Sequence, residues 1–239
     1  MSQLTASRLT VLSTDVHIGT EHECKWQISA EIFADPGAFA TRTFDGLITP
    51  VGGTQDYLES VLYFDDAEGN LAMAGHTLSV VVNSGGPSST AVLSFKQALH
   101  SRGWRDALEV RQRVPGDEVD ARLQDPTTLP VKQVRELRLL AGPLRPSGFA
   151  VQRRFKRHGV TQNGTEIFCS LDDVHFGDPA TPKNQRLRYV CLEVEVNDSG
   201  PEALTDLDHI AAELDGRLGV PRDARSKSQR ARAPIPGAA

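Results

Sequence analysis

The sequence is poor in cysteine and has no long apolar run. Its 239 residues include three cysteines, Cys24, Cys169 and Cys191, which are far apart and never form a C-x-x-C pair. This odd, scattered set indicates neither a disulfide framework nor a zinc site, and unpaired thiols favour a reducing compartment. No apolar stretch reaches the roughly 18 residues of a membrane-spanning helix, and no signal peptide is recognisable. We therefore expect a cytoplasmic protein that does not engage a membrane.

An excess of positive charge is also missing. The formal net charge is -5, so no global field attracts nucleic acid or an anionic surface. The basic residues between 225 and 232 fit a solvated tail better than an RNA contact. A polyanionic ligand would therefore need a local basic lining inside an acidic protein. The length is compatible with one large β-rich domain, and the composition is ordinary for a globular chain.

Alternating polar and apolar residues predict about eight strands in antiparallel hairpins. The expected strands cover residues 19–29, 56–65, 76–83, 90–97, 106–114, 148–158, 165–172 and 188–197. Helical patterns occupy 30–45, with an interruption at 35–37, then 131–140 and 201–218, beside a short helical piece at 71–74. Pro201 and Gly219 suit the start and the end of the helix over 201–218.

Domain boundaries follow from the same patterns. Residues 1–18 are rich in serine and threonine and predict a flexible leader, and residues 19–230 predict a single domain. Residues 231–239 are rich in proline, glycine and alanine and predict a disordered tail. Residues 84–89 predict a hairpin loop between two strands.

The stretch that carries the chemistry is the strand around Glu21. Side chains alternate along a strand, so Glu21, Glu23 and Lys25 share one face, while Cys24 and Trp26 lie on the opposite, core-forming face. Two carboxylates beside an ammonium suit a cavity in which a divalent cation meets a polyanion. Taken alone, the short E-x-E-x-K pattern also fits a solvated edge strand.

A second strand has the same character. Glu193 and Glu195 share one face of the strand over 188–197, and aliphatic residues share the other. Strands with one charged and one aliphatic face close naturally into a barrel with a polar lumen and an apolar outside covered by helices. We therefore predict an α+β fold, an antiparallel eight-stranded closed β-barrel with helices packed on the outside.

Together these segments resemble the CYTH family, also called triphosphate tunnel metalloenzymes, over residues 19 to 230. The likeness is to the thiamine-triphosphatase-like and inorganic triphosphatase branch. The matching segments are, in family order, Glu21-x-Glu23-x-Lys25, Tyr63-Phe64-Asp65 with Leu71, Gly75 and Leu78, Leu93-Ser94-Phe95-Lys96, Leu171-Asp172-Asp173-Val174, Leu192-Glu193-Val194-Glu195, and Leu218-Gly219-Val220-Pro221 with Ser226-Lys227. The resemblance implies a tunnel that binds a triphosphate.

One departure stands out. Where the family usually places R-x-R to hold phosphate oxygens, this chain has Ser79 and Val81. Arg111 and Arg113, which share a strand face with Glu109, could compensate, or the triphosphate site could have decayed. Each lost charge-assisted contact costs about 1.5–3 kcal/mol of binding. Two unreplaced losses would weaken binding by a factor of ~100 or more.

The resemblance implies hydrolysis of inorganic triphosphate, thiamine triphosphate or a nucleoside triphosphate with Mg²⁺ or Mn²⁺. Two alternatives stay open: a catalytically impaired module that binds polyphosphate or nucleotide, and a class IV-type adenylate cyclase. The family often forms dimers, so a homodimer is also open.

The site residues that the resemblance implies fall into three groups. The catalytic group is Glu21, Glu23 and Lys25, and the metal ligands are Glu21, Glu23, Asp172, Glu193 and Glu195. Substrate would be bound by Lys96, Arg111, Arg113, Arg153, Arg154, Lys156 and Lys227. Only one of Arg153 and Arg154 can point inward, and the apolar residues on the opposite face favour Arg154. His22 and His175 lack a second ligand at metal spacing, which predicts that both are surface residues.

Overall fold

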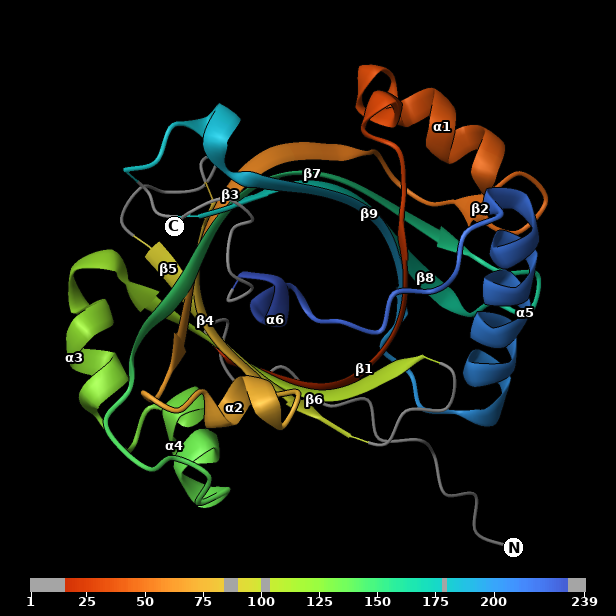
Figure 1. Ribbon diagram of the computed structural model, residues 1–239. Helices are drawn as coiled ribbons and strands as arrows, with labels where there is room; N and C mark the ends of the chain where they lie inside the picture. Colours follow the sequence, from red (N-terminus) through yellow and green to blue (C-terminus); the bar gives the residue numbers. More distant parts are fainter. Residues whose placement is uncertain (1–15, 84–89, 100–103, 178–179, 232–239) are drawn as a thin grey trace, which may run out of the picture.

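The computed structural model describes residues 16–83, 90–99, 104–177 and 180–231. Its strands form one antiparallel sheet in the order β2-β7-β3-β4-β5-β6-β1-β9-β8, and pairing of β7 with β8 closes the sheet into an eight-stranded barrel (Figure 1). β2 is a two-residue addition to β7. The prediction of a closed antiparallel barrel with helices outside it is confirmed.

The strands are close to their expected bounds. They are β1 (Val16–Gln27), β2 (Thr49–Pro50), β3 (Gln55–Asp65), β4 (Thr77–Asn83), β5 (Thr90–Ala98), β6 (Arg105–Pro115), β7 (Arg145–Val160), β8 (Glu166–Phe176) and β9 (Leu187–Val196). β1 begins before residue 19, so the last residues of the expected leader belong to the barrel. Residues 1–15, the expected hairpin loop over 84–89 and residues 232–239 of the expected tail lie outside the described residues.

The helical segments connect the strands. They are η1 (Ala30–Ala34), α1 (Pro36–Thr43), α2 (Asn70–Met73), η2 (Gly116–Glu118), α3 (Val119–Gln124), α4 (Leu129–Glu136), η3 (Lys183–Gln185), α5 (Pro201–Leu218) and α6 (Lys227–Ala231). The interruption expected at 35–37 separates η1 from α1. α4 ends earlier than expected, and α3 and α6 were not predicted.

Two apolar cores lie outside the barrel. α1 and α5 cover one side, and α3 and α4 cover the opposite side (Figure 1). The first core joins Cys24 and Trp26 of β1 to Leu207, Ile210 and Leu214 of α5. Trp26 has no exposed surface and donates its indole N–H to Asp215 Oδ1 at 2.8 Å. The outward face of the E-x-E-x-K strand thus packs as its alternation predicts.

α6 lies inside the ring of strands (Figure 1). The chain leaves α5 at Gly219, which adopts the left-handed conformation with φ of 63°. Arg222 then forms an isolated antiparallel backbone bridge with Trp26 of β1. Ala231 at the end of α6 packs against Gly148 of β7, where a Cβ atom would be 2.9 Å from the Cβ of Ala231. The C-terminal segment therefore fills part of the lumen.

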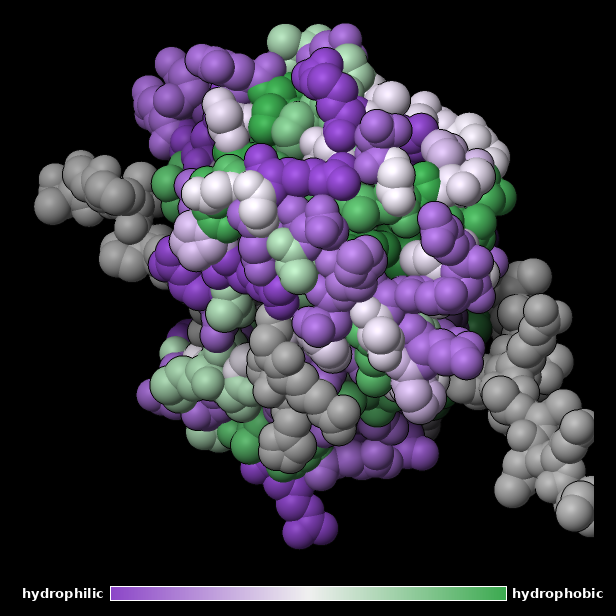
Figure 2. Space-filling model, turned by 90° about the vertical axis from the view of Figure 1, so that its right-hand side faces the viewer, coloured by the Kyte–Doolittle hydropathy of each residue, from purple (hydrophilic) through white to green (hydrophobic). Residues whose placement is uncertain are grey.

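The surface over α1 and α5 is mostly polar, with scattered apolar side chains (Figure 2). Among the described helices, none is long and apolar enough to cross a membrane.

Candidate active site in the barrel lumen

The lumen holds a cavity of about 280 Å³. Its lining includes four acidic side chains, those of Glu23, Glu59, Glu109 and Glu193. Seven basic side chains also line it: Lys25, Lys96, Arg105, Arg111, Arg154, Lys156 and Lys227. The cavity lining is therefore net positive, although the whole protein is acidic.

The E-x-E-x-K strand supplies the centre of the site. Glu21, Glu23 and Lys25 are all buried, with 2%, 6% and 3% of their surface exposed. The strand register sets Glu23 opposite Glu195 of β9 and Lys25 opposite Glu193. A solvated edge strand is ruled out, because β1 pairs with β6 on one side and β9 on the other.

Three carboxylates converge beside the cavity. Glu21, Glu23 and Glu195 each place an oxygen within 4.8 Å of the others. Lys96 Nζ donates to both oxygens of Glu21, at 2.7 and 2.6 Å, and Lys25 Nζ donates to Glu23 at 3.3 Å. Glu195 forms no ion pair with any described residue. A cluster of hard oxygen donors with one uncompensated member fits Mg²⁺ or Mn²⁺.

The environment of Glu195 disfavours its charge. Burial, followed by the negative charge of Glu21, raises the pKa of the Glu195 carboxyl to about 7, although Lys96 opposes the shift. A cation bound beside Glu195 would remove this penalty by supplying the missing positive charge.

A second acidic group is already neutralised. Asp172, which is fully buried, accepts two 2.8 Å hydrogen bonds from Arg154, and Glu193 accepts one of 2.8 Å from the same guanidinium. Lys227 of α6 contacts both carboxylates and is 3.0 Å from Glu193. Burial opposes ionisation of Glu193, but Lys227 and Arg154 outweigh it and hold its pKa well below the usual range.

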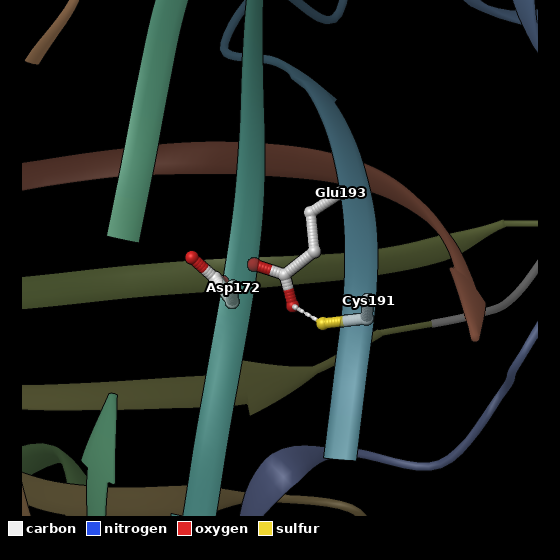
Figure 3. A group of neighbouring side chains, drawn as sticks. All are labelled: Asp172, Cys191 and Glu193. Atoms are coloured by element: carbon white, nitrogen blue, oxygen red, sulfur yellow. Dashed lines mark hydrogen bonds between the residues drawn. The ribbon is translucent and has the colours of Figure 1, made fainter. Parts of the chain in front are cut away.

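This second group combines two carboxylates with a thiol. Glu193 of β9 points toward Asp172 of β8, and the thiol of Cys191 lies beside it (Figure 3). Burial raises the pKa of the Cys191 thiol well above its ordinary value, and a protonated thiol is a poor metal ligand. The expected metal role of Asp172 and Glu193 stays a prediction, and their contacts show two carboxylates that position Arg154 and Lys227.

A third ion pair lies on β6. Arg111 Nη2 is 2.5 Å from Glu109 Oε2, and Ser94 donates to the same carboxyl group at 3.2 Å. Burial opposes the charge of Glu109, yet Lys96 and Arg111 lower its pKa to about 2. Arg113 lies on the same side of β6 but is exposed and does not border the cavity.

Lys156 differs from the other basic residues of the lumen. It borders the cavity, and no described carboxylate lies within 4.0 Å of its ammonium group. Burial, followed by the charge of Arg154, lowers its pKa. Lys156 is therefore a cation held in the lumen without a close counter-charge.

The register of β7 decides between the two neighbouring arginines. Arg154 points into the lumen, whereas Arg153 points outward and binds Asp56 at 2.9 and 2.6 Å. Arg153 was kept as a possible substrate ligand, and this expectation is wrong. Side chains alternate along a strand, so the side chain of Arg153 points away from the cavity. Lys25, Lys96, Arg111, Lys156 and Lys227 line the cavity as expected.

Several lumen residues escaped the sequence analysis. Arg105 begins β6, one residue before the strand start that we expected, and its side chain donates to the carbonyl oxygen of Gly75 at 3.1 Å. Glu59 and Gln152 face the lumen from β3 and β7 and contact each other. Each shares a strand face with a residue that the sequence analysis had named, Gln152 with Arg154 and Glu59 with Tyr63. The two-residue alternation along each strand could therefore have identified both.

His22 is not a surface residue. It is 6% exposed and His175 is 8% exposed, so the expectation for both is wrong. His22 lies on the outward face of β1, where β6 and the turn before α5 enclose it.

No protein-family model matches the sequence, and no curated protein matches it. Solved structures do. A candidate adenylate cyclase from Bacillus halodurans aligns with a TM-score of 0.57 and 16% identity, covering 89% of this chain and 97% of that one. A candidate adenylyl cyclase from Hippeastrum, described as having a dominant triphosphatase activity, aligns with a TM-score of 0.52 and 15% identity over 90% and 95%. A Pyrococcus horikoshii protein aligns with a TM-score of 0.50 and 15% identity over 88% and 97%.

The chain has the tunnel fold of these proteins. At such identities the likeness extends to the fold alone. The likeness accounts for the closed ring of strands.

Proposed function

We propose that the chain hydrolyses a triphosphate inside the barrel, with Mg²⁺ or Mn²⁺ held by Glu21, Glu23 and Glu195. The observation that carries this proposal is the juxtaposition of a cavity lined by seven basic side chains with a three-carboxylate cluster, of which Glu23 borders that cavity. A dense polyanion needs cations on the wall and a metal to bridge its oxygens. The bound ion would neutralise phosphate charge and polarise the phosphoryl group.

The residues of the chain would position the substrate. Lys156 has no carboxylate of the described residues within ion-pair distance, so it is available to bind phosphate oxygens. Arg154 and Lys227 would exchange contacts with Asp172 and Glu193 for contacts with the substrate, because all four groups meet at one place. Water would attack the terminal phosphorus in line, and the basic wall would stabilise the departing diphosphate.

The cavity size favours a compact ligand. Its volume of about 280 Å³ is near the lower end of small-molecule pockets, which are roughly 300–1,000 Å³. Inorganic triphosphate, or the triphosphate end of a larger ester, is the substrate class that this volume and charge support.

Phosphate release from the full chain tests the proposal. Inorganic triphosphate, thiamine triphosphate and ATP would each be supplied with Mg²⁺, Mn²⁺ or EDTA. We expect metal-dependent release that Glu21→Gln combined with Glu23→Gln reduces at least 100-fold, while Glu166→Gln, on an exposed residue of β8, leaves it unchanged. Release that persists in EDTA or in the double variant would contradict the proposal. Production of cyclic AMP from ATP would instead favour the cyclase alternative.

A binding module without turnover is the second candidate. Ser79 and Val81 both border the cavity, so the wall that could have carried two arginines has none. If this loss limits affinity, Val81→Arg will tighten binding of inorganic triphosphate about 10-fold or more, which corresponds to at least one charge-assisted contact. Val82→Arg, at an exposed neighbour, is the matched control and should leave the affinity unchanged. Tight calorimetric binding by the wild type without phosphate release would establish the module.

A further inference from the structure

A second constellation lies on the outer side of the barrel, away from the lumen. His22 Nδ1 is 2.6 Å from Asp106 Oδ1, and His22 Nε2 is 3.0 Å from Ser199 Oγ. His22 and Asp106 face each other across β1 and β6 and are 6% and 8% exposed, whereas Ser199 is exposed. An acid, an imidazole and a hydroxyl are thus joined in one hydrogen-bonded line.

The order of the three groups is compatible with one assignment of proton roles. An ionised carboxylate only accepts hydrogen bonds, so Asp106 receives the Nδ1–H of His22. In the tautomer with the proton on Nδ1, the Nε2 lone pair faces Ser199 Oγ at 3.0 Å and is placed to accept the hydroxyl proton. This is the arrangement in which an imidazole acts as general base toward a serine nucleophile.

The position of Ser199 adds a place for developing negative charge. Ser199 immediately precedes Gly200, the N-cap of the 18-residue helix α5, and no side chain caps this helix end. Within the described residues, the first-turn amides of Glu202 and Ala203 have no hydrogen-bond acceptor. Unpaired amides at the start of a long helix carry partial positive charge and stabilise an adjacent oxyanion.

A hollow of about 350 Å³ lies on the same turn. Asp198, Gly200, Glu202 and Ala203 border it, so both chain neighbours of Ser199 line the hollow, while the Ser199 hydroxyl is directed at His22. Asp198 already accepts the amide N–H of Gly200 at 2.8 Å, which leaves the helix amides as the available donors. The two carboxylates of Asp198 and Glu202 would repel an anionic ligand.

We propose that Ser199, His22 and Asp106 form a second catalytic site, which hydrolyses neutral or cationic carboxylic esters. Ser199 Oγ would attack the carbonyl carbon while its proton passes to His22 Nε2. The ester C–O bond would then break, and the leaving alkoxide would take that proton. A water molecule, deprotonated by His22, would then attack the acyl carbon. The bond to Ser199 Oγ would break, and His22 would return the proton to Ser199 as the carboxylic acid leaves. Ser199 and His22 are catalytic residues here, and Asp106 is a positioning residue.

The experiment treats the full-length chain with a fluorophosphonate probe and locates the adduct by peptide mass spectrometry. We expect a single adduct on Ser199 and turnover of neutral 4-nitrophenyl acetate. Ser199→Ala should abolish both, while Ser60→Ala, at another exposed serine, should change neither. His22→Gln should slow labelling by about 100-fold or more, the usual contribution of a general base.

Two further readouts separate catalysis from a structural role. Asp106→Asn keeps the side-chain shape but places an amide donor against Nδ1 of His22. The imidazole proton should then move to Nε2, and labelling of Ser199 at neutral pH should fall. The thermal midpoint of unfolding should stay the same. An ester with an anionic acyl group should react at least 10-fold more slowly than the acetate. Triphosphate release should be the same in Ser199→Ala and wild type, so the two activities fail independently. A chain whose Ser199 reacts no faster than Ser60 would overturn the proposal.

Discussion

Glu195 forms no ion pair with the described residues, unlike Glu21 and Glu23 beside it. Its folded-state pKa is about 7, against an ordinary value of 4.5, because it is buried beside Glu21. Between these two pH values the folded chain retains a proton that the unfolded chain has lost. Glu195 therefore lowers the stability of the metal-free protein progressively as pH rises from 4.5 to 7.

The corresponding prediction compares Glu195→Gln with the wild type. Without metal, the variant should gain stability relative to the wild type as pH rises through this window, by about 1–3 kcal/mol at neutral pH. Urea unfolding in EDTA at several pH values measures the difference. In the wild type, Mn²⁺ should bind more tightly as pH rises through 7, because the metal needs the ionised carboxylate. A constant stability difference from pH 4.5 to 7 would contradict this assignment.

Lys156 should affect binding and stability in opposite directions. Burial, followed by the charge of Arg154, lowers the pKa of its ammonium group, which forms no ion pair with a described carboxylate. Lys156→Met should leave the free energy of unfolding unchanged or raise it by about 1 kcal/mol, since a disfavoured charge is removed. The same change should weaken triphosphate binding about 10- to 100-fold, since a charge-assisted phosphate contact is lost.

Arg153 provides the matched control for Lys156. Its side chain is 44% exposed and is paired with Asp56 outside the barrel. Calorimetric affinity for inorganic triphosphate should therefore be the same in Arg153→Gln and wild type. Equal affinities of Lys156→Met and wild type would place the substrate elsewhere.

At the scale of elements, α6 is the part of the fold most dependent on tertiary contacts. It has only five residues, which is too short to be stable alone. Lys227 binds Asp172 and Glu193, and Ala231 packs on Gly148. Arg230 stacks over Tyr189 at 4.0 Å and pairs with Asp223.

Gly148→Ala should displace α6 without unfolding the barrel. The added Cβ would meet Ala231 at 2.9 Å, and a five-residue helix gives way more easily than β7, which is paired within the sheet. We expect faster tryptic cleavage at Lys227 and Arg230, with the barrel fragment intact. Gly53→Ala is the control, because nothing lies within 4 Å of its added Cβ. Equal cleavage rates in the two variants would show that α6 is not held by this contact.

The elements also show what the sequence could reveal. The two-residue period of β1 was enough to assign Glu23 to the lumen and Trp26 to the outer core, because alternation is a local property. α5 was predictable because Pro201 and Gly219 delimit an apolar stripe. α6 was not, because its basic residues resemble a solvated tail until Asp172 is known to lie beside Lys227.

At the scale of the whole molecule, pairing between strands that are distant in the sequence creates contacts that the sequence concealed. His22 is 84 residues from Asp106 and 177 residues from Ser199 in the sequence, so no local pattern predicts their hydrogen bonds. Closure of β7 on β8 also brings Arg154 to Asp172. The lumen charges were visible as residue types, but their partners depend on strand order. The expected homodimer and cytoplasmic location stay predictions.

The central claim is that one lumen holds both a divalent cation and a triphosphate. The most direct measurement is a crystal structure of the chain grown with Mn²⁺ and a non-hydrolysable triphosphate analogue, with anomalous data for manganese. The account predicts a manganese peak among Glu21, Glu23 and Glu195, and phosphate density against Lys96, Arg111 and Lys156. Saturated crystals with a lumen free of both, or with manganese bound only outside the barrel, would contradict it.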